Sequence, residues 1–363
     1  MKRRWFLFTL IFIFSVIGST IMAQPASKLP EVFTPKSGVK TIQYKAHKAP
    51  YKLAFVNGFA GNAWRIQCIQ AAKAWAVLPQ NKSLISEFKV ISTGEDIAAQ
   101  IAAIDNFIAA GYDGIVFIAL NPTAFDAVIK RAEKAGTVLV PFDNVLDTDQ
   151  ICQVNQDQFG MGKLWVEYIV SNMKVKKGTL LEVRGVQGNA TDRDRHLGAM
   201  EALKPYPDIK VIEVVGNWDT GTTQKVVADA IATHGKFDGI WVQFGAAGAI
   251  NAVLDAKHPI IPISGDPQND VRMQLAANKI PGGTSGQSPS LSAVALQATV
   301  YLLQGHALPR MILMPSPSLD NKYLKDGESY FTNLPPTFTP AYNFDGVGFT
   351  FKVDDLLKQT VDN

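Results

Sequence analysis

The feature that most constrains the fold is a regular alternation of short apolar runs with longer amphipathic stretches. In the stretch 96–110, four isoleucines recur at spacings of four, three and four residues, at Ile97, Ile101, Ile104 and Ile108. This spacing places them on one face of a helix. Because buried strands that alternate with such helices form βαβ units, the sequence predicts an α/β fold with parallel sheets covered on both faces.

The second half of the chain repeats the pattern of the first. A segment that opens with Tyr112-Asp113-Gly114-Ile115 and continues through a helix to a second strand closes at Asp143, 31 residues after Tyr112. A matching segment opens with Phe237-Asp238-Gly239-Ile240 and closes at Asp266, 29 residues after Phe237. Such a repeat predicts two similar doubly wound lobes.

The two closing aspartates are candidate binding residues. In open α/β sheets, ligands bind beyond the carboxyl ends of the strands, and Asp143 and Asp266 each follow a strand at that end. If the lobes face one another, both carboxylates point into one cleft. The alternatives are that Asp143 caps a turn and that Asp266, which precedes Pro267, is a helix N-cap.

The first residues are expected to be an export signal. Lys2, Arg3 and Arg4 precede an apolar run at 5–21, and Ala23 is a suitable cleavage site. The sequence therefore predicts a periplasmic protein whose signal peptide, 1–23, is removed; an uncleaved membrane anchor is the alternative. The whole chain has 35 basic and 32 acidic residues, and the leader holds three of the basic ones, so the mature chain is balanced and a nucleic-acid partner is not expected.

Cysteine, histidine and glycine patterns give no indication of a metal or cofactor. Cys68 and Cys152 are 84 positions apart, and a disulfide and two separately buried thiols remain equally open. The chain has no CxxC motif, its five histidines lack metal-ligand spacing, and its glycine spacings match no nucleotide-binding loop. We expect no cofactor and no metal site.

Short segments spread along the chain form a recognisable set. They are Asn62-Ala63-Trp64, Ala110-Gly111-Tyr112-Asp113-Gly114-Ile115, Pro141-Phe142-Asp143-Asn144, Arg193-Asp194-Arg195, Gly265-Asp266 and Thr284-Ser285-Gly286-Gln287. On these segments the chain resembles the type I periplasmic binding proteins of the ribose-binding class, over roughly 51–314. The resemblance implies two lobes joined by a multi-stranded hinge.

The resemblance also implies a domain organisation. After the signal peptide, residues 24–50 form an N-terminal tail with no periodic pattern. The N-terminal lobe would comprise 51–156 plus 288–314, and the C-terminal lobe 157–287 plus part of 315–363. No motif was found in the tail at 315–363, which we expect to pack across or beside the hinge.

In the N-terminal lobe, the resemblance implies four binding residues. Asn62 would hydrogen-bond the hydroxyl groups of a sugar, and Trp64 would stack on its ring. Asp143 would accept hydrogen bonds from two vicinal hydroxyls, and Asn144 would support it.

In the C-terminal lobe, the resemblance implies four more. Arg195 would donate hydrogen bonds in a fork, and Trp218 would supply the opposite aromatic wall. Asp266 and Gln287 would complete the polar set. No catalytic residue is expected.

Three positions depart from the family pattern. Arg65 stands where a second aromatic residue is usual, and Gly58 stands where Ser or Thr is common. After the strand at 239–242, where an asparagine is common, this chain has Gln243-Phe244-Gly245. Arg65 could favour an acidic ligand or point to solvent, and Phe244 could narrow the pocket to suit a small polyol. Arg65 and Phe244 are therefore weaker candidate binding residues.

The function implied is that of a monomeric receptor that binds a sugar or polyol, closes about its hinge and docks on the membrane permease of an ABC importer. On this interpretation the protein is not an enzyme. One alternative is hand-off of the ligand to a chemoreceptor or sensor kinase. The other is a secreted sugar-modifying enzyme that uses Asp143 and Asp266 as acid and base.

Overall fold

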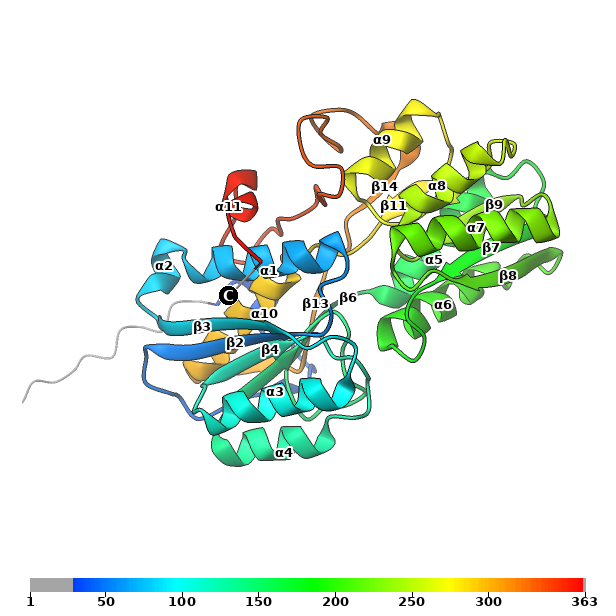
Figure 1. The fold of residues 1–363 in the computed structure, drawn as a ribbon. Coiled ribbons are helices and arrows are strands. Elements are labelled where there is room, and N and C mark those ends of the chain that lie inside the picture. Colours follow the sequence, from blue (N-terminus) through cyan, green and yellow to red (C-terminus); the bar gives the residue numbers. More distant parts are fainter. Residues whose placement is uncertain (1–28, 362–363) are drawn as a thin grey trace, which may run out of the picture.

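The computed structural model describes residues 29–361, so the predicted signal peptide at 1–23 and its cleavage site lie outside the described residues. Two α/β lobes lie side by side, and several chain segments run between them (Figure 1). Within residues 29–361, no helix combines the length and the apolar character that crossing a bilayer requires.

The N-terminal lobe is built on a four-stranded parallel sheet. Its strands, in spatial order, are β3 (Ile85–Ser92), β2 (Tyr51–Asn57), β4 (Gly114–Phe117) and β5 (Val138–Pro141). One face is covered by α1 (Ala63–Ala76) and α10 (Leu291–Leu303), and the other by α3 (Ile97–Ala109) and α4 (Asp126–Ala135) (Figure 1). Alternate residues of β2 enter the two cores, Leu53 and Phe55 on one side and Ala54 and Val56 on the other.

The C-terminal lobe has the same construction. Its parallel strands, in spatial order, are β8 (Ile209–Val215), β7 (Gly178–Arg184), β9 (Gly239–Val242) and β10 (Ile263–Ser264). Helices α5 (Gln158–Asn172) and α6 (Ala190–Leu203) cover one face, and α7 (Thr220–His234), α8 (Ala246–Asp255) and α9 (Asn269–Ala277) the other. In each lobe the second strand of the chain lies at one edge and the fourth at the other, so the predicted doubly wound repeat is confirmed.

The helix at 96–110 shows how local sequence sets an element. Asp96 is its N-cap, because its carboxylate accepts hydrogen bonds from the amides of Ala98 and Ala99 at 2.8 and 3.2 Å. Ile104 on the apolar face is fully buried, and Ile101 and Ile108 pack against the same core. The predicted bounds and the observed ones differ by one residue at each end.

The hinge is formed by strands from distant parts of the chain. β6 (Gln153–Gln156) pairs in parallel with β13 (Met311–Met314), and β14 (Ser318–Asp320) pairs with β11 (Gly283–Ser285). The chain therefore passes between the lobes near 156–158, 286–290 and 314–317.

The described part of the N-terminal tail, whose sequence has no periodic pattern, contains short structural elements. It contains η1 (Glu31–Phe33) and β1 (Thr41–Ile42), and β1 pairs with β12 (Leu308–Pro309). Phe33 is fully buried in the N-terminal core, where its ring meets Tyr301 edge-on. Residues 29–50 thus pack on this lobe. Burial of the Phe33 ring stabilises the segment, although its sequence has no helical or strand period.

The two cysteines and the last elements complete the fold. Cys68 and Cys152 are both free and buried, so the alternative of two separate thiols is the one observed.

The short elements are α2 (Pro79–Lys82), η2 (Asn321–Tyr323) and α11 (Val353–Leu357). After β14 the C-terminal tail runs beside α9 and then crosses to α1, where α11 lies (Figure 1).

Candidate functional site

A cavity lies between the lobes at the carboxyl ends of both sheets, and it is lined by residues of both. All ten candidate binding residues line it: Asn62, Trp64, Arg65, Asp143, Asn144, Arg195, Trp218, Phe244, Asp266 and Gln287. The lobes touch across it, since the Asn62 side-chain amide donates to the Trp218 carbonyl at 3.3 Å, and the Trp64 indole donates to the carbonyl of Gln287 in the hinge at 3.0 Å. The structure therefore brings the whole predicted set together.

Asp143 is held in an unusual backbone conformation. Its φ is 64°, in the left-handed region that Asp tolerates better than most residues. Its Oδ1 accepts a hydrogen bond from the side-chain amide of Gln287, and Asn144 donates to its Oδ2 at 3.1 Å with the amide oriented to suit its neighbours. Thr191, from the other lobe, donates to its carbonyl oxygen at 3.2 Å. The carboxylate faces the cavity rather than capping a turn.

The electrostatics of Asp143 follow from burial and two arginines. Burial raises the pKa of Asp143, and the positive charges of Arg65 and Arg195 together with the Gln287 hydrogen bond oppose that rise. The carboxylate and both guanidinium groups thus lie in one water-poor cleft, where each hydrogen bond to a charged group is stronger than in water.

Arg195 is buried and donates hydrogen bonds to two side-chain oxygens and one main-chain carbonyl. Its guanidinium donates to Gln158 Oε1 at 2.9 Å, to the Gln243 carbonyl at 3.0 Å and to Gln287 Oε1 at 2.6 Å. Burial lowers its pKa to about 10, and nearby aspartates, Asp143 first, oppose that shift. These three acceptors take one hydrogen bond each from Nε, Nη1 and Nη2, so two of the five guanidinium N–H groups are left for a ligand.

Arg65 points into the protein, so the alternative that it points to solvent is wrong. Its Nη1 donates to Asn57 Oδ1 at 2.9 Å, and its guanidinium lies 5.4 Å from the centre of the Phe59 ring. Burial lowers its pKa, and Asp143 opposes that shift.

Asp266 has one satisfied oxygen and one unsatisfied oxygen. Oδ1 accepts from the amide of Ala246, the first residue of α8, at 2.9 Å. Oδ2 has no hydrogen-bond partner within residues 29–361, although the residue is only 3% exposed. Burial raises the pKa of Asp266, and backbone hydrogen bonds oppose that rise. The N-cap position of α9 belongs to Gln268, so the predicted alternative for Asp266 is wrong.

The aromatic walls come from opposite lobes. Trp64 lies in the first turn of α1, after the N-cap Asn62, whose side-chain amide donates to the Trp218 carbonyl at 3.3 Å. Trp218 has a φ of 53°, and its indole lies against Gly185, where an added Cβ would be 2.0 Å from Nε1. Gly185 is therefore required for the position of that ring.

The sequence interpretation missed further lining residues. They are Thr191, Gln243, Pro267, Gln268, Gly286 and Thr339. Gln243 follows the last residue of β9, so the strand-end rule could have found it. Thr339 belongs to the C-terminal tail, where no motif or period marks it.

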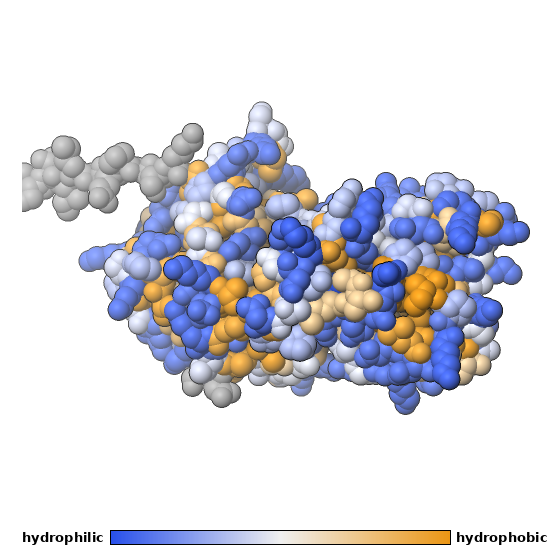
Figure 2. Space-filling view, turned by 90° about the horizontal axis from the view of Figure 1, so that it is seen from above, coloured by the Kyte–Doolittle hydropathy of each residue, from blue (hydrophilic) through white to orange (hydrophobic). Residues whose placement is uncertain are grey.

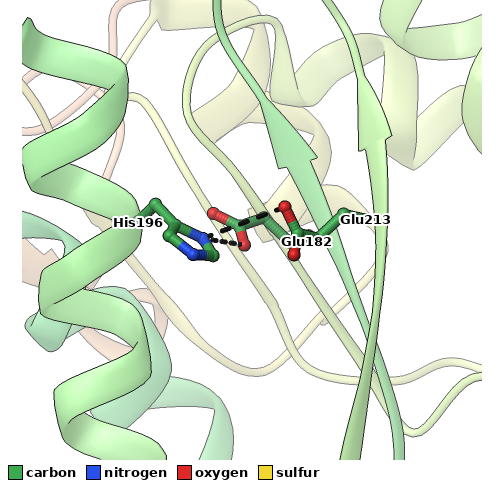
Figure 3. A group of neighbouring side chains, drawn as sticks. All are labelled: Glu182, His196 and Glu213. Carbon is green, nitrogen blue, oxygen red and sulfur yellow. Dashed lines mark hydrogen bonds and ion pairs between the residues drawn. The ribbon is translucent and has the colours of Figure 1, made fainter. Parts of the chain in front are cut away.

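A second cluster of titratable groups lies outside the cavity, on α6, β7 and β8 (Figure 3). His196 Nδ1 is 2.8 Å from Glu182 Oε2 and 4.0 Å from Glu213 Oε2. Arg184 pairs with the same group, because its Nη1 is 2.7 Å from Glu213 and its Nε is 3.7 Å from Glu182, and its Nη2 links the group to Asp192 at 2.6 Å. We interpret the cluster as a structural ion-pair network on the sheet.

The chain matches the family described as "Periplasmic binding protein domain" over residues 53–307. It is 24% identical to the xylitol-binding protein of Mycolicibacterium smegmatis, over 48% of this chain and 51% of that protein. It is 25% identical to the galactofuranose-binding protein of Escherichia coli, over 57% of this chain and 67% of that protein. The chain thus spans about half of the length of the first relative and two thirds of the second.

Solved structures share the architecture. An ABC transporter solute binding protein from Thermobispora bispora superposes with a TM-score of 0.70 at 24% identity, covering 78% of this chain and 91% of that one. A galactofuranose binding protein superposes with a TM-score of 0.69 at 22% identity, covering 75% and 95%. At these identities the likeness shows a shared fold over about three quarters of this chain.

Proposed function

We propose a function for this chain from the premise that it belongs to the periplasmic binding protein domain family: it is the substrate-binding receptor of an ABC importer, and it binds a sugar or polyol between its lobes. The observation that carries this proposal is the cavity itself. Two carboxylates, two guanidinium groups and two indoles, contributed by both lobes, line one buried space.

The chemistry of that lining fits a polyhydroxylated guest. A sugar or polyol has hydroxyl groups that need charged acceptors and donors, and C–H surfaces that pack on aromatic rings. Asp143 and Asp266 are the acceptors, Arg195 is a donor, and Trp64 and Trp218 are the walls. Relatives whose names state a ligand bind xylitol, galactofuranose or D-allose.

Charge balance favours a neutral ligand over a sugar acid. The cavity holds Asp143 and Asp266 against Arg65 and Arg195, so its formal charges cancel. An acidic ligand would add an uncompensated negative charge to a buried site, which costs free energy. We therefore propose that Arg65 balances Asp143 rather than binding a carboxylate of the ligand.

The receptor is proposed to perform no chemistry. Both aspartates serve as hydrogen-bond acceptors, and the ligand would leave unchanged when the lobes separate about the hinge. We propose that the mature chain begins after Ala23, acts in the periplasm as a monomer and delivers its ligand to a membrane permease.

A thermal-shift screen tests the proposal. The chain from residue 24 onward is mixed with xylitol, D-ribose, D-allose, D-xylose, D-galactose, myo-inositol and D-gluconate, with L-leucine as a control that lacks hydroxyl groups. A ligand at 100 times its Kd stabilises the native state by about 2.7 kcal/mol, which corresponds to a rise in Tm of roughly 4 °C for a chain of this length. A rise with a neutral sugar or polyol is expected. A rise with L-leucine alone, or with no hydroxylated compound, would contradict the proposal.

A further inference from the structure

The C-terminal tail beyond the family match is bound first to the C-terminal lobe. The amides of Asn269 and Asp270, the first residues of α9, donate to the carbonyls of Phe338 and Pro336 at 2.9 and 2.7 Å. The Asn269 side chain also forms two hydrogen bonds of 2.7 Å with the main chain of Phe331. These contacts satisfy amides that a helix start leaves without partners, so the tail is an integral part of this lobe.

The same tail then passes to the N-terminal lobe within one residue. The side chain of Phe338 packs in the N-terminal core, where its ring centre lies 5.4 Å from that of Tyr342. Its carbonyl remains hydrogen-bonded to α9. The next residue, Thr339, is held by Gln67 of α1, whose side chain accepts from its amide at 2.8 Å and donates to its carbonyl at 3.1 Å. We call residues 331–342 the strap, because they join both lobes.

The strap lies on the side of the molecule that carries α9 and α11 (Figure 1). In the view of that side, hydrophilic residues cover both lobes and separate small apolar groups (Figure 2). Within the strap, the side chain of Thr337 is exposed, whereas those of Phe338 and Thr339 are buried. The strap therefore has an outer side toward solvent and an inner side toward the cavity.

The inner side presents an unsatisfied hydroxyl. Thr339 lines the cavity and is 1% exposed, and its Oγ1 has no hydrogen-bond partner in the described part of the chain. Asp266 lines the same cavity, and its Oδ2 is also unpartnered. Nine buried side-chain atoms within residues 29–361 lack a partner, and these two are the ones whose residues line the cavity, where a polar guest would supply the missing hydrogen bonds.

We propose that Thr339 contacts the ligand, that the strap is a third wall of the binding site, and that Thr339 Oγ1 hydrogen-bonds a hydroxyl group of the guest. This inference rests on the proposed function. A threonine hydroxyl can both donate and accept, which suits a sugar or polyol hydroxyl. Gln67 is a positioning residue, because it fixes the main chain of Thr339 on both sides and so aims the side chain.

Isothermal titration calorimetry with xylitol, D-ribose, D-allose, D-xylose, D-galactose and myo-inositol tests the inference on the chain from residue 24 onward. Thr339→Val keeps the shape of the side chain and removes the hydroxyl, Thr339→Ser keeps the hydroxyl, and Thr337→Val on the exposed side of the strap is the matched control. Thr339→Val should weaken binding about 10-fold, since a buried ligand hydroxyl loses its partner. Thr339→Ser and Thr337→Val should bind within about threefold of wild type.

The ligand-free Tm separates a binding role from a structural one. Because Oγ1 is unpaired in the free protein, Thr339→Val should keep or raise the Tm while it lowers affinity. Gln67→Leu should also weaken binding, and adding Thr339→Val to it should cost little more, because both changes remove the same contact. Unchanged affinity in Thr339→Val overturns the inference and leaves the proposed function standing. Absence of binding by wild type to all six compounds overturns both.

Discussion

Asp143→Asn is the perturbation that most directly tests the electrostatics of the cleft. The change keeps the shape of the side chain and removes the charge that lies between Arg65 and Arg195. An asparagine can orient its oxygen toward Gln287, the present donor to Oδ1. Its NH₂ group then replaces Oδ2, which accepts from Asn144 and is proposed to accept from the ligand, and an NH₂ group accepts from neither.

The magnitude follows from the number and kind of hydrogen bonds lost. Asp143 is proposed to accept from two hydroxyls of the ligand, and each charge-assisted bond contributes about 1.5–3 kcal/mol against about 0.5–1.5 kcal/mol for a neutral one. Losing one bond and the charge assistance of the other costs about 2–4 kcal/mol, which is roughly a 30- to 1,000-fold rise in Kd.

Stability should change less than affinity. Two buried guanidinium groups lose a nearby negative charge, which destabilises the contact between the lobes. The same change also removes the free-energy cost of burying a charged carboxylate, the cost that raises the pKa of Asp143. This second effect stabilises the variant. We therefore expect the ligand-free Tm to shift by only a few degrees.

Calorimetric titration with the best ligand of the screen measures the effect. Asp149→Asn is the control, because that side chain is 61% exposed and pairs with Lys40 away from the cavity. Wild-type affinity is expected for the control. An Asp143→Asn variant that binds within threefold of wild type, or a control that weakens equally, would refute the role assigned to the carboxylate.

Three further predictions concern residues that do not themselves line the cavity. Burial and a neighbouring carboxylate raise the pKa of Asp270 to about 7, so the folded state binds more protons between about pH 4 and 7 and loses stability as the pH rises through that window. Scanning calorimetry should therefore find that Asp270→Asn has a higher Tm than wild type at pH 8 and the same Tm near pH 4. Gly185→Ala places a Cβ 2.0 Å from Trp218 Nε1 and should displace the indole, weakening ligand binding about 2- to 10-fold in titrations; unchanged affinity would show that the ring is no wall of the site. The hydrogen bond to Glu182 raises the pKa of His196, so its stabilisation is present below about pH 6.5 and is lost as the pH rises through the higher folded value. His196→Gln should accordingly lower the Tm more at pH 6 than at pH 9, and an equal loss at both would count against this pair.

The sequence by itself determined the fold class and the location of the site. A helical period, such as the isoleucines of 97–108, is a local property, and its alternation with short apolar strands predicted two doubly wound lobes with parallel sheets. The carboxyl end of each strand marks where ligands bind, so the sequence predicted one cleft for Asp143 and Asp266 provided that the lobes face one another, and both residues line one cavity.

Tertiary structure alone decided the direction of Arg65, the packing of Phe33 and the presence of Thr339 in the cavity. These depend on contacts between residues far apart in the chain: Gln67 meets Thr339 across 272 positions. No period or motif encodes such a pair, because the contact exists only after both lobes and the hinge have formed. The physical reason is that burial and hydrogen bonding of an irregular segment are set by the surface it meets, not by its own sequence pattern.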